Sequence, residues 1–266
     1  MKFGFIGCGN MGGALASAVA KSMDQKEIAV TDAFQQKAEA FAKTYGVTAT
    51  DTASIAENAE YIFLGVKPQV FEELFAEIAP ILQKRTAPFV LVSMAAGISI
   101  SAVEKMADCD PAVIRIMPNT PVSVGAGVVL YSANAKVGKN EIETFCKALS
   151  AAGVVDPIPE DKIDAASALS GCGPAFVALF AEALADGAVE CGLPRDKAAL
   201  YAAQTILGTA KLILESGKHP GQIKDAVCSP GGTTIEGVHA LENGNFRAAS
   251  MNAVTAAYEK TLKLKK

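Results

Sequence analysis

The chain has no tryptophan, only two histidines and no closely spaced pair of cysteines. Its six cysteines stand singly and none belongs to a Cys-x-x-Cys pair, which argues against a zinc site or a disulfide framework. His219 and His239 have too few companions to form a metal centre, and we expect both to be structural helix residues. The sequence therefore predicts a reduced, cytoplasmic protein without a metal ion.

The chain also lacks an excess of charge and a long apolar run. Its formal net charge of −4 offers no attraction to nucleic acid or to an anionic membrane. No uninterrupted apolar run reaches the roughly 20 residues of a transmembrane helix, and the first apolar stretch, about four residues, is too short for a signal peptide. With 266 residues, half of them hydrophobic, the composition is typical of a globular enzyme with one large or two modest domains.

Short apolar runs alternate with helical patterns over the first 158 residues. Because the runs are apolar throughout, we expect strands buried on both faces, in a parallel sheet covered by helices. This is the doubly wound α/β, or Rossmann, architecture. The predicted strands are 2–6, 27–31, 61–66, 89–94, 112–117, 127–131 and 154–157, and the predicted helices are 11–22, 33–45 and 71–82.

The character of the chain changes after about Pro159, where strand-like runs end and helical patterns take over. The segment 174–191 is apolar on nearly every side, with its charges confined to Glu182, Asp186 and Glu190. Such a helix is buried on most sides, and a domain of about 105 residues has limited room for it, so we predict a subunit interface. Further helices are expected at 194–214, 220 onward, 233–242 and 246–264. We expect a dinucleotide-binding domain at 1–158 and a helical domain at 159–266.

A glycine-rich motif, GCGNMG at residues 7–12, follows the first predicted strand and opens a helix. In this context the glycines allow a tight turn and a close approach of the backbone to a pyrophosphate. Asp32 lies twenty residues after Gly12 at the end of a strand, where a carboxylate accepts hydrogen bonds from both ribose hydroxyls of NADH and repels the 2′-phosphate of NADPH. The alternative for Asp32, capping the following helix, is compatible with that role.

Two further strand ends, GVKP at 65–68 and SMAAG at 93–97, fall at the edge where a doubly wound sheet holds its ligand. For Lys67 the alternative is an ordinary solvated lysine. The expected cofactor-binding residues are Gly7, Gly9, Asn10, Met11, Gly12, Asp32, Thr52, Val66, Lys67, Pro68, Ser93, Ala95, Ala96 and Asn119.

The segment SPGGTTIEGVHALE at 229–242 predicts a small-anion site. Glycines let backbone amides approach a ligand, and Thr233 and Thr234 stand where a helix with a positive dipole end begins. Such a site suits a small carboxylate carrying one further polar group. The alternative is that both threonines only cap the helix.

Together these motifs resemble the pyrroline-5-carboxylate reductase family. The resemblance covers the whole chain and rests on GFIGCGNMG, GVKPQ, SMAAGISI, RIMPNTP, SGCGPAF, ADGAVECGLPR and HPGQIKDAVCSPGGTTIEGVHALE. It implies a Rossmann domain followed by a helical dimerisation domain, a homodimer that in some members builds decamers, and reduction of L-1-pyrroline-5-carboxylate to L-proline by NADPH or NADH. Asp32 departs from the small polar residue of NADPH-preferring members and favours NADH.

The resemblance also implies where the substrate binds. Backbone amides around Gly231–Thr233 would take the carboxylate, Thr234 would hydrogen-bond the ring nitrogen, and Glu160 would add negative charge that favours the protonated imine. For the SGCGP segment, a plain helix start is the alternative. The expected substrate-binding residues are Gly231, Gly232, Thr233, Thr234, Glu160, Ser170 and Gly171, with Thr234 and Glu160 as the catalytic pair.

Two other functions remain open from the sequence. A β-hydroxyacid dehydrogenase of the 6-phosphogluconate type would share the domain order, but it would use a lysine on the long helix, and 170–191 contains none. A non-catalytic NAD(P)-binding sensor would not need the SPGGTT segment. A module that binds pyridoxal phosphate would require a lysine in a preorganised pocket, and the sequence points to no such lysine.

Overall fold

The computed structural model describes residues 1–264 and divides the chain into two compact units. The first unit comprises Met1–Gly171 and the C-terminal residues from Tyr258, and the second comprises Cys172–Ala257. Packing therefore divides the chain one helix later than the change in composition at 158/159. The division of functions between 1–158 and 159–266 remains a prediction.

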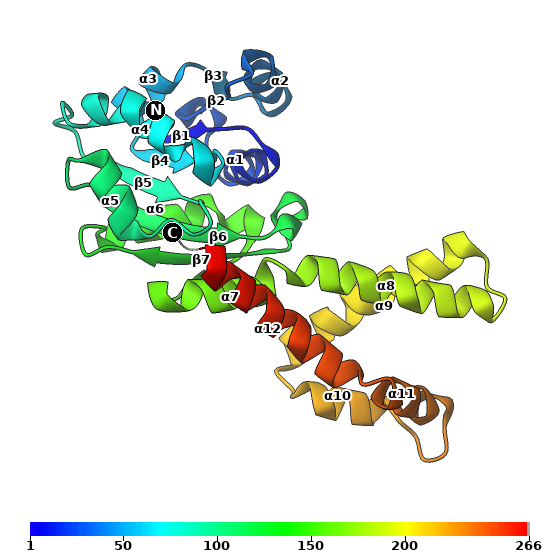
Figure 1. Cartoon of the computed structure of the whole chain (residues 1–266). Coiled ribbons are helices and arrows are strands. Elements are labelled where there is room, and N and C mark those ends of the chain that lie inside the picture. The colour runs from blue at the N-terminus through cyan, green and yellow to red at the C-terminus, as the bar shows by residue number, and fades with distance from the viewer. Residues whose placement is uncertain (265–266) are drawn as a thin grey trace. The chain divides into compact units, whose positions relative to one another are not determined.

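The first unit is built on an eight-stranded sheet in the order β3-β2-β1-β4-β5-β6-β7-β8 (Figure 1). Strand β1 pairs in parallel with β2 on one side and with β4 on the other, so the strand order reverses at β1. The strands are β1 Phe3–Ile6, β2 Ile28–Thr31, β3 Thr48–Ala49, β4 Tyr61–Leu64, β5 Val90–Ser93, β6 Ala112–Pro118, β7 Gly127–Ala133 and β8 Gly153–Pro157.

Helices cover both faces of this sheet and create two apolar cores. Side chains alternate along β1, so that Phe5 joins the core beneath α1, α2 and α6, and Ile6 joins the core beneath α3, α4 and α5. The doubly wound arrangement is confirmed. The α-helices of this unit are α1 Asn10–Ser22, α2 Gln35–Tyr45, α3 Thr52–Asn58, α4 Phe71–Leu82, α5 Ile100–Ala107, α6 Lys139–Ala148 and α7 Ile163–Ser170. Single 3-10 turns are η1 Gln25–Glu27, η2 Pro68–Val70, η3 Thr120–Val124, η4 Ser150–Ala152 and η5 Glu160–Lys162.

The sheet is mixed, so the expectation of an entirely parallel sheet is wrong at one pair. Strands β6 and β7 are antiparallel, and eight residues between Pro118 and Gly127 join them. A parallel crossover needs about a dozen residues or more, usually a helix, whereas this link holds only η3. The short link therefore forces the chain to reverse direction.

Helix boundaries follow local hydrogen bonds more closely than apolar periodicity. α4 begins and ends where the sequence predicts, and Gly46 ends α2 in the left-handed conformation at φ 72°. α2 starts at Gln35 and not at Ala33, because the amide of Phe34 donates to Oδ1 of Asp32 and Phe34 becomes the N-cap. Pro194 is likewise the N-cap of α9 and not its first residue.

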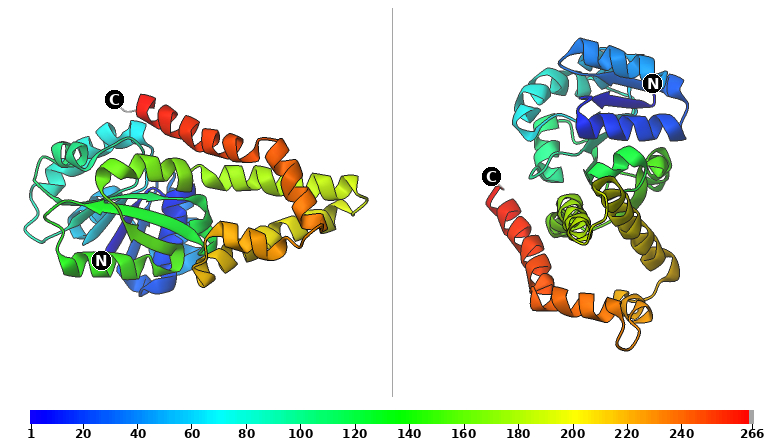
Figure 2. Two further views of the ribbon diagram at one scale, coloured as in Figure 1. Left: turned by 90° about the horizontal axis from the view of Figure 1, so that it is seen from below. Right: turned by 90° about the vertical axis from the view of Figure 1, so that its right-hand side faces the viewer.

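The second unit is helical. Its helices are α8 Gly173–Glu190, α9 Arg195–Ser216, α10 Pro220–Val227, α11 Thr233–Asn243 and the first part of α12 Phe246–Leu264. α8 and α9 lie side by side (Figures 1 and 2), and Arg195 forms an ion pair with Asp186 between them. His219 caps α10 through Nδ1, which accepts from Gly221 N at 3.1 Å. His219 thus has the structural role that the sequence predicts.

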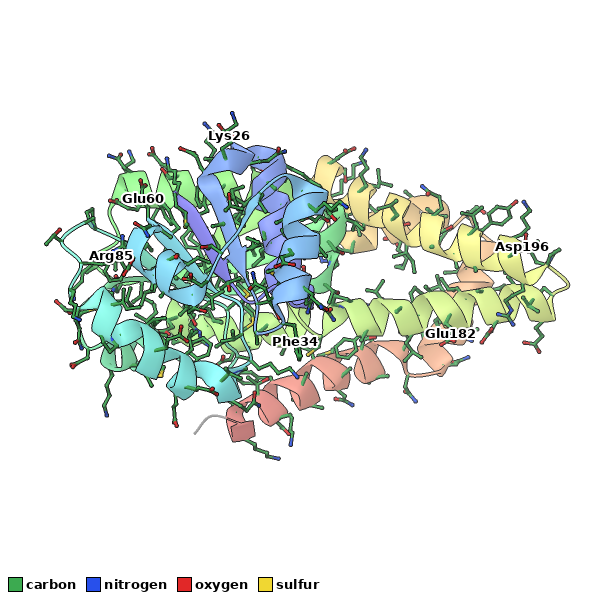
Figure 3. The ribbon with its side chains drawn as sticks, turned by 90° about the horizontal axis from the view of Figure 1, so that it is seen from above. Lys26, Phe34, Glu60, Arg85, Glu182 and Asp196 are labelled. Atoms are coloured by element: carbon green, nitrogen blue, oxygen red, sulfur yellow. The ribbon has the colours of Figure 1, made fainter. Side chains whose placement is uncertain are left out.

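The second unit exposes apolar helix surface in the single chain. On α8 only Ala185 is buried, while the side chain of Leu179 is 67% exposed; the polar stripe includes Glu182 (Figure 3). The burial expected for this helix is therefore absent within one chain. By length and composition the stretch Glu160–Glu190 could also cross a membrane: its mean hydropathy is 1.5, and 11% of its most apolar part is buried. Apolar surface of this kind marks a site of association.

Candidate functional site

The carboxyl ends of five strands meet at one edge of the sheet. The strand order changes direction between β1 and β4, and ligands of doubly wound sheets bind at such a switch point. The first residues beyond strands β1, β2, β4, β5 and β6 are Gly7, Asp32, Gly65, Met94 and Asn119. The structure thus brings the sequence-predicted segments of the first unit to a common edge.

Three glycines at this edge pack backbone against backbone. Gly7 has φ 102°, and a Cβ there would lie 2.8 Å from the carbonyl carbon of Gly65. A Cβ on Gly12 would overlap the carbonyl oxygen of Gly7, and a Cβ on Gly65 would lie 2.8 Å from the same oxygen. These glycines let β1, α1 and the end of β4 approach one another.

Gly9 has a different role, because a Cβ there would meet no atom within 4 Å. Gly9 is the N-cap of α1, and α1 has neither a side-chain cap nor an acidic residue in its first turn. Free amides and a positive dipole end therefore face open space, as phosphate binding requires. Asn10 and Met11 begin this helix. The residues at the edge fit the pyrophosphate of a dinucleotide.

The carboxylate of Asp32 ties this loop to the next element. Oδ2 accepts from the amide of Cys8 at 2.7 Å and Oδ1 accepts from the amide of Phe34 at 3.1 Å. Each oxygen keeps a second lone pair for a ribose hydroxyl. Burial, with a smaller contribution from Asp32, raises the pKa of the Cys8 thiol to about 11, so Cys8 is a packed thiol and not a nucleophile.

The remaining expected cofactor residues occupy the same edge with different exposure. Thr52 is the first residue of α3, whose N-cap is Asp51. After β4, Lys67 is exposed, and after β5, Ser93 and Ala95 are buried. Val66, Pro68 and Ala96 complete the set and are partly or fully exposed. The buried residues among them support the backbone at this edge of the sheet, whereas the exposed residues can contact a ligand.

An ion-pair cluster that the sequence did not predict lies beside the same edge. Arg115, 4% exposed on β6, bonds Glu160 Oε1 through Nη1 at 3.1 Å and Asp164 Oδ1 through Nη2 at 3.2 Å. Glu160 Oε1 also accepts from the amide of Ile100, at 2.8 Å. One guanidinium therefore bridges two carboxylates from successive helical turns. The single charge within the apolar strand AVIRIMP is the signal that could have identified Arg115.

Asn119 also uses both ends of its side chain inside the protein. Nδ2 donates to the carbonyl oxygen of Ser170 at 2.9 Å, and Oδ1 accepts from the amide of Val128 at 2.8 Å. Ser170 and Gly171 therefore lie next to the end of β6. The structure brings these two expected substrate residues to the edge that carries the expected cofactor residues.

In the second unit the SPGGTT segment forms an uncapped helix start. Gly231 has φ 66° with open space around it, and Gly232 is the N-cap of α11, which has no side-chain cap. Thr233 and Thr234 are the first two helical residues, so the capping role considered for them falls to Gly232. Ser229, which sequence reasoning did not single out, accepts from the amide of Gly232 through its carbonyl at 3.0 Å. The segment presents backbone amides and two hydroxyls, as an anion site requires.

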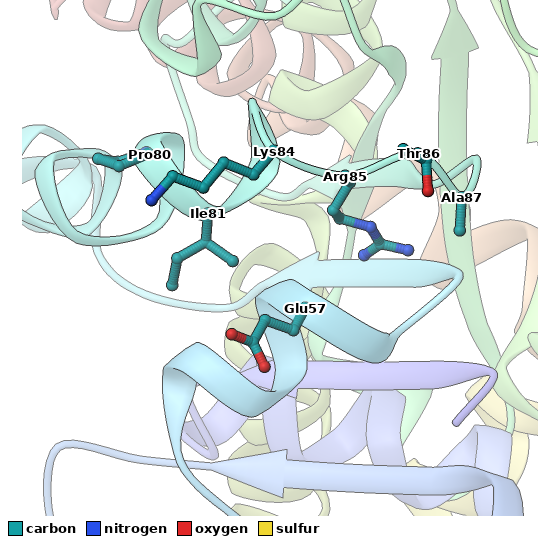
Figure 4. Close-up of a pocket in the computed structure, with 7 residues that line it drawn as sticks. All are labelled: Glu57, Pro80, Ile81, Lys84, Arg85, Thr86 and Ala87. Atoms are coloured by element: carbon teal, nitrogen blue, oxygen red, sulfur yellow. The ribbon is translucent and has the colours of Figure 1, made fainter.

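A separate pocket of about 400 Å³ lies between α3 and the end of α4, lined by Glu57 and residues 80–81 and 84–87 (Figure 4). Arg85, one of the lining residues, donates from Nη1 to the carbonyls of Ala56 and Ala59, both at 2.8 Å, and its guanidinium carbon lies 4.7 Å from the Phe89 ring centroid. These bonds give Arg85 a structural role. The pocket precedes β5, at the opposite edge from the glycine loop.

Comparison with known proteins gives two family matches. Residues 160–264 match the model described as pyrroline-5-carboxylate reductase dimerisation. Residues 2–97 match the model described as NADP oxidoreductase, coenzyme F420-dependent. The first match covers the helical region with the exposed apolar surface, and the second covers the glycine loop, so the first unit contains an NAD(P)-binding domain.

Full-length relatives agree with these matches. The chain is 44% identical to pyrroline-5-carboxylate reductase of Synechocystis sp. over 269 residues, covering 100% of this chain and 99% of the relative. A pyrroline-5-carboxylate reductase structure from Coxiella burnetii superposes with a TM-score of 0.92 at 35% identity, covering 100% and 98%. The Plasmodium falciparum enzyme, with NADP bound, gives 0.87 at 31% identity, covering 100% and 98%.

Proposed function

The chain belongs to the pyrroline-5-carboxylate reductase family, and we propose how its residues divide the reduction of L-1-pyrroline-5-carboxylate to L-proline by NAD(P)H. Similarity along the entire length of such relatives carries the assignment of the reaction. A dehydrogenase of the 6-phosphogluconate type is disfavoured by the same similarity and by the absence of lysine from 170–191.

The cofactor is held at the edge of the first unit. The amides at the N-terminus of α1 receive the pyrophosphate, and Asp32 receives the ribose hydroxyls. Thr52, Val66–Pro68 and Ala96 contact the remainder, with Ser93 and Ala95 shaping the edge. The bound dinucleotide supplies the hydride. We favour NADH, because the Asp32 carboxylate repels a 2′-phosphate. The exposed ring of Phe34 lies two residues after Asp32 in the chain (Figure 3).

The substrate is a cyclic imine with a carboxylate, and its protonated C=N accepts a hydride without a strong acid. The amides of Gly231–Thr233, at the uncapped start of α11, take the carboxylate. The Thr234 hydroxyl accepts from the ring N–H and fixes the imine plane. Glu160 contributes negative charge that favours the protonated imine. Arg115 neutralises part of the Glu160 charge. We therefore expect the site to act more by positioning the imine than by donating a proton to it.

The assembly is a homodimer formed through the exposed apolar helices. Leu179 of α8 and Leu207 of α9, 67% and 58% exposed, are large side chains that a partner copy would bury. The same pairing accounts for the apolar stretch Glu160–Glu190. A decamer built from such dimers is the larger form to test. The six free thiols among the described residues support a cytoplasmic setting.

The direct test is turnover. Purified protein is incubated with L-1-pyrroline-5-carboxylate and NADH or NADPH, nicotinamide absorbance is followed, and proline is identified in the product. We expect substrate-dependent oxidation of the cofactor and stoichiometric proline. Absence of turnover with both cofactors, in protein that binds NADH, would overturn the assignment and favour the sensor alternative.

A further inference from the structure

Strand β6 and the residue that follows it carry two buried polar side chains in an otherwise apolar stretch. Arg115 is 4% exposed and Asn119 is 8% exposed. Burying a cation or an amide is unfavourable unless its hydrogen bonds are satisfied, so both residues need a structural or functional reason. Four residues apart on an extended chain, they point to the same face.

Both side chains reach the same short helix, at opposite ends. Arg115 bonds Asp164 in the first turn of α7, at 3.2 Å, and Glu160 in the preceding turn η5, at 3.1 Å. Asn119 bonds the carbonyl of Ser170, the last residue of α7, at 2.9 Å. The end of β6 thus holds α7 at two points.

The anchors are themselves fixed. Oδ1 of Asn119 accepts from Val128 N of β7 at 2.8 Å, so the amide group cannot rotate without losing two bonds. Oε1 of Glu160 accepts from Ile100 N at 2.8 Å, at the start of α5, directly after the loop 94–99. The two-point clamp therefore connects the start of α5, the end of β6 and the Ser170–Gly171 turn.

We propose that Arg115 and Asn119 are positioning residues for substrate, which act by fixing the Ser170–Gly171 turn through the two ends of α7. The inference deepens the proposed function, since it rests on Ser170 and Gly171 contacting the substrate. Both polar atoms of the Asn119 side chain are bonded inside the protein, so we assign it to the substrate side in place of the cofactor contact that the sequence predicts.

Asn119→Asp tests the clamp with minimal change of volume. A carboxylate keeps the acceptor for Val128 N but sets an oxygen against the Ser170 carbonyl. We expect KM for pyrroline-5-carboxylate to rise roughly 10-fold, kcat to change less, and the NADH Kd, measured by fluorescence without substrate, to stay within about 2-fold. Hydrogen exchange of residues 167–171, including the Gly171 amide that bonds Ser167 O, should accelerate.

Asn134→Asp is the matched control. Asn134 directly follows β7 and is comparably bonded: Nδ2 donates to Glu104 at 2.7 Å and to Pro111 O at 2.9 Å, and Oδ1 accepts from Val113 N at 3.2 Å, so its printed partners lie outside α7. A general loss of stability would appear in both variants.

Arg115→Lys keeps the positive charge but cannot bond both carboxylates through two nitrogens. This variant should raise the substrate KM and accelerate hydrogen exchange at residues 163–166.

Two outcomes would overturn the clamp: equal KM effects in the Asn119 and Asn134 variants, or a weakened NADH Kd in Asn119→Asp with an unchanged substrate KM. The second would make Asn119 a direct cofactor contact. If the wild-type protein fails to reduce the imine, the proposed function fails, whereas unchanged exchange at 163–171 in the variants would separately refute the clamp.

Discussion

The amide of Cys8 donates to Oδ2 of Asp32 over 2.7 Å, so one carboxylate holds the nucleotide loop in place. Its other oxygen bonds Phe34 N at 3.1 Å and sets the start of α2. Replacing Asp32 therefore changes both loop stability and the charge that faces the cofactor ribose.

Asp32→Ser should shift cofactor preference towards NADPH. Removing a negative charge near the 2′-position relieves repulsion, and we expect the NADPH-to-NADH ratio of kcat/KM to rise about 10-fold or more. Losing the bond to Cys8 N should lower the free energy of unfolding by about 1–2 kcal/mol. Steady-state kinetics with both cofactors and denaturant unfolding measure these effects.

Asp24→Ser is the control, because Asp24 also accepts from a backbone amide, Lys26 N at 3.0 Å, but lies before β2. Its cofactor ratio should equal that of the wild type. A strong NADPH preference in the wild-type protein would contradict the role given to Asp32.

Two alanine substitutions in the glycine loop should separate folding from binding. In Gly12→Ala the new Cβ overlaps the Gly7 carbonyl, and we expect destabilisation by about 1–3 kcal/mol or more. In Gly9→Ala the Cβ meets no atom within 4 Å, so stability should hold while NADH affinity falls. Calorimetric unfolding and NADH titration distinguish the variants. Unchanged NADH affinity in Gly9→Ala would argue against pyrophosphate binding there.

Thr234→Ala should lower kcat/KM for pyrroline-5-carboxylate about 10-fold or more with folding intact, because the ring N–H loses an acceptor. Thr234→Ser retains the hydroxyl and should recover most of the activity. NADH binding should be the same in both variants. Wild-type kinetics in Thr234→Ala would exclude the assigned role.

Stability should fall at alkaline pH. Burial raises the pKa of Cys8 from 9.0 to about 11, and burial raises the pKa of Tyr61, whose hydroxyl donates to Glu141 O, from 10.0 to about 12. The unfolded chain loses these protons first, so their contribution is complete below pH 9 and declines as pH rises towards 11 and 12. The slope is at most about 1.4 kcal/mol per pH unit for each group.

Urea unfolding between neutral and alkaline pH measures this decline. Cys8→Ala and Tyr61→Phe should each flatten the curve relative to the wild type. Parallel curves for all three proteins would show that neither group is responsible.

Leu179→Glu should weaken the homodimer. A carboxylate in an apolar interface is costly to desolvate, and we expect monomer to predominate at micromolar concentration. Sedimentation equilibrium gives the mass and would also reveal a decamer in the wild type. Glu182→Gln, on the polar stripe of the same helix, should leave the mass unchanged. An unaltered dimer in Leu179→Glu would place the interface elsewhere.

Sequence reasoning succeeded where one local rule decided the outcome. The helices at 71–82 and 246–264 have sustained helical patterns, and both bounds of the first and the start of the second match the structure. It missed α5, which is short and depends on a Ser99 cap and on Glu160, sixty residues away in sequence. It placed β6 and β7 in a parallel sheet because apolar strands do not reveal their direction.

The candidate site also contains residues that the sequence predicts and one that it does not. Gly9 and Asp32 were identified because a glycine spacing and a strand-end carboxylate carry their own physical reason. Arg115 was missed because its partners, Glu160 and Asp164, become neighbours only through the tertiary fold. An isolated charge in an apolar strand is the sign that would have prompted the search.

The glycine cluster has a consequence for protein engineering. Because Gly7, Gly12 and Gly65 meet around one carbonyl oxygen, the nucleotide loop is not a portable cassette of residues 7–12. A loop transplanted into another scaffold would need a glycine at the recipient's equivalent of Gly65, on a strand far away in sequence. Exchange of cofactor loops between enzymes is therefore expected to succeed only when the neighbouring strand end is transferred with the loop.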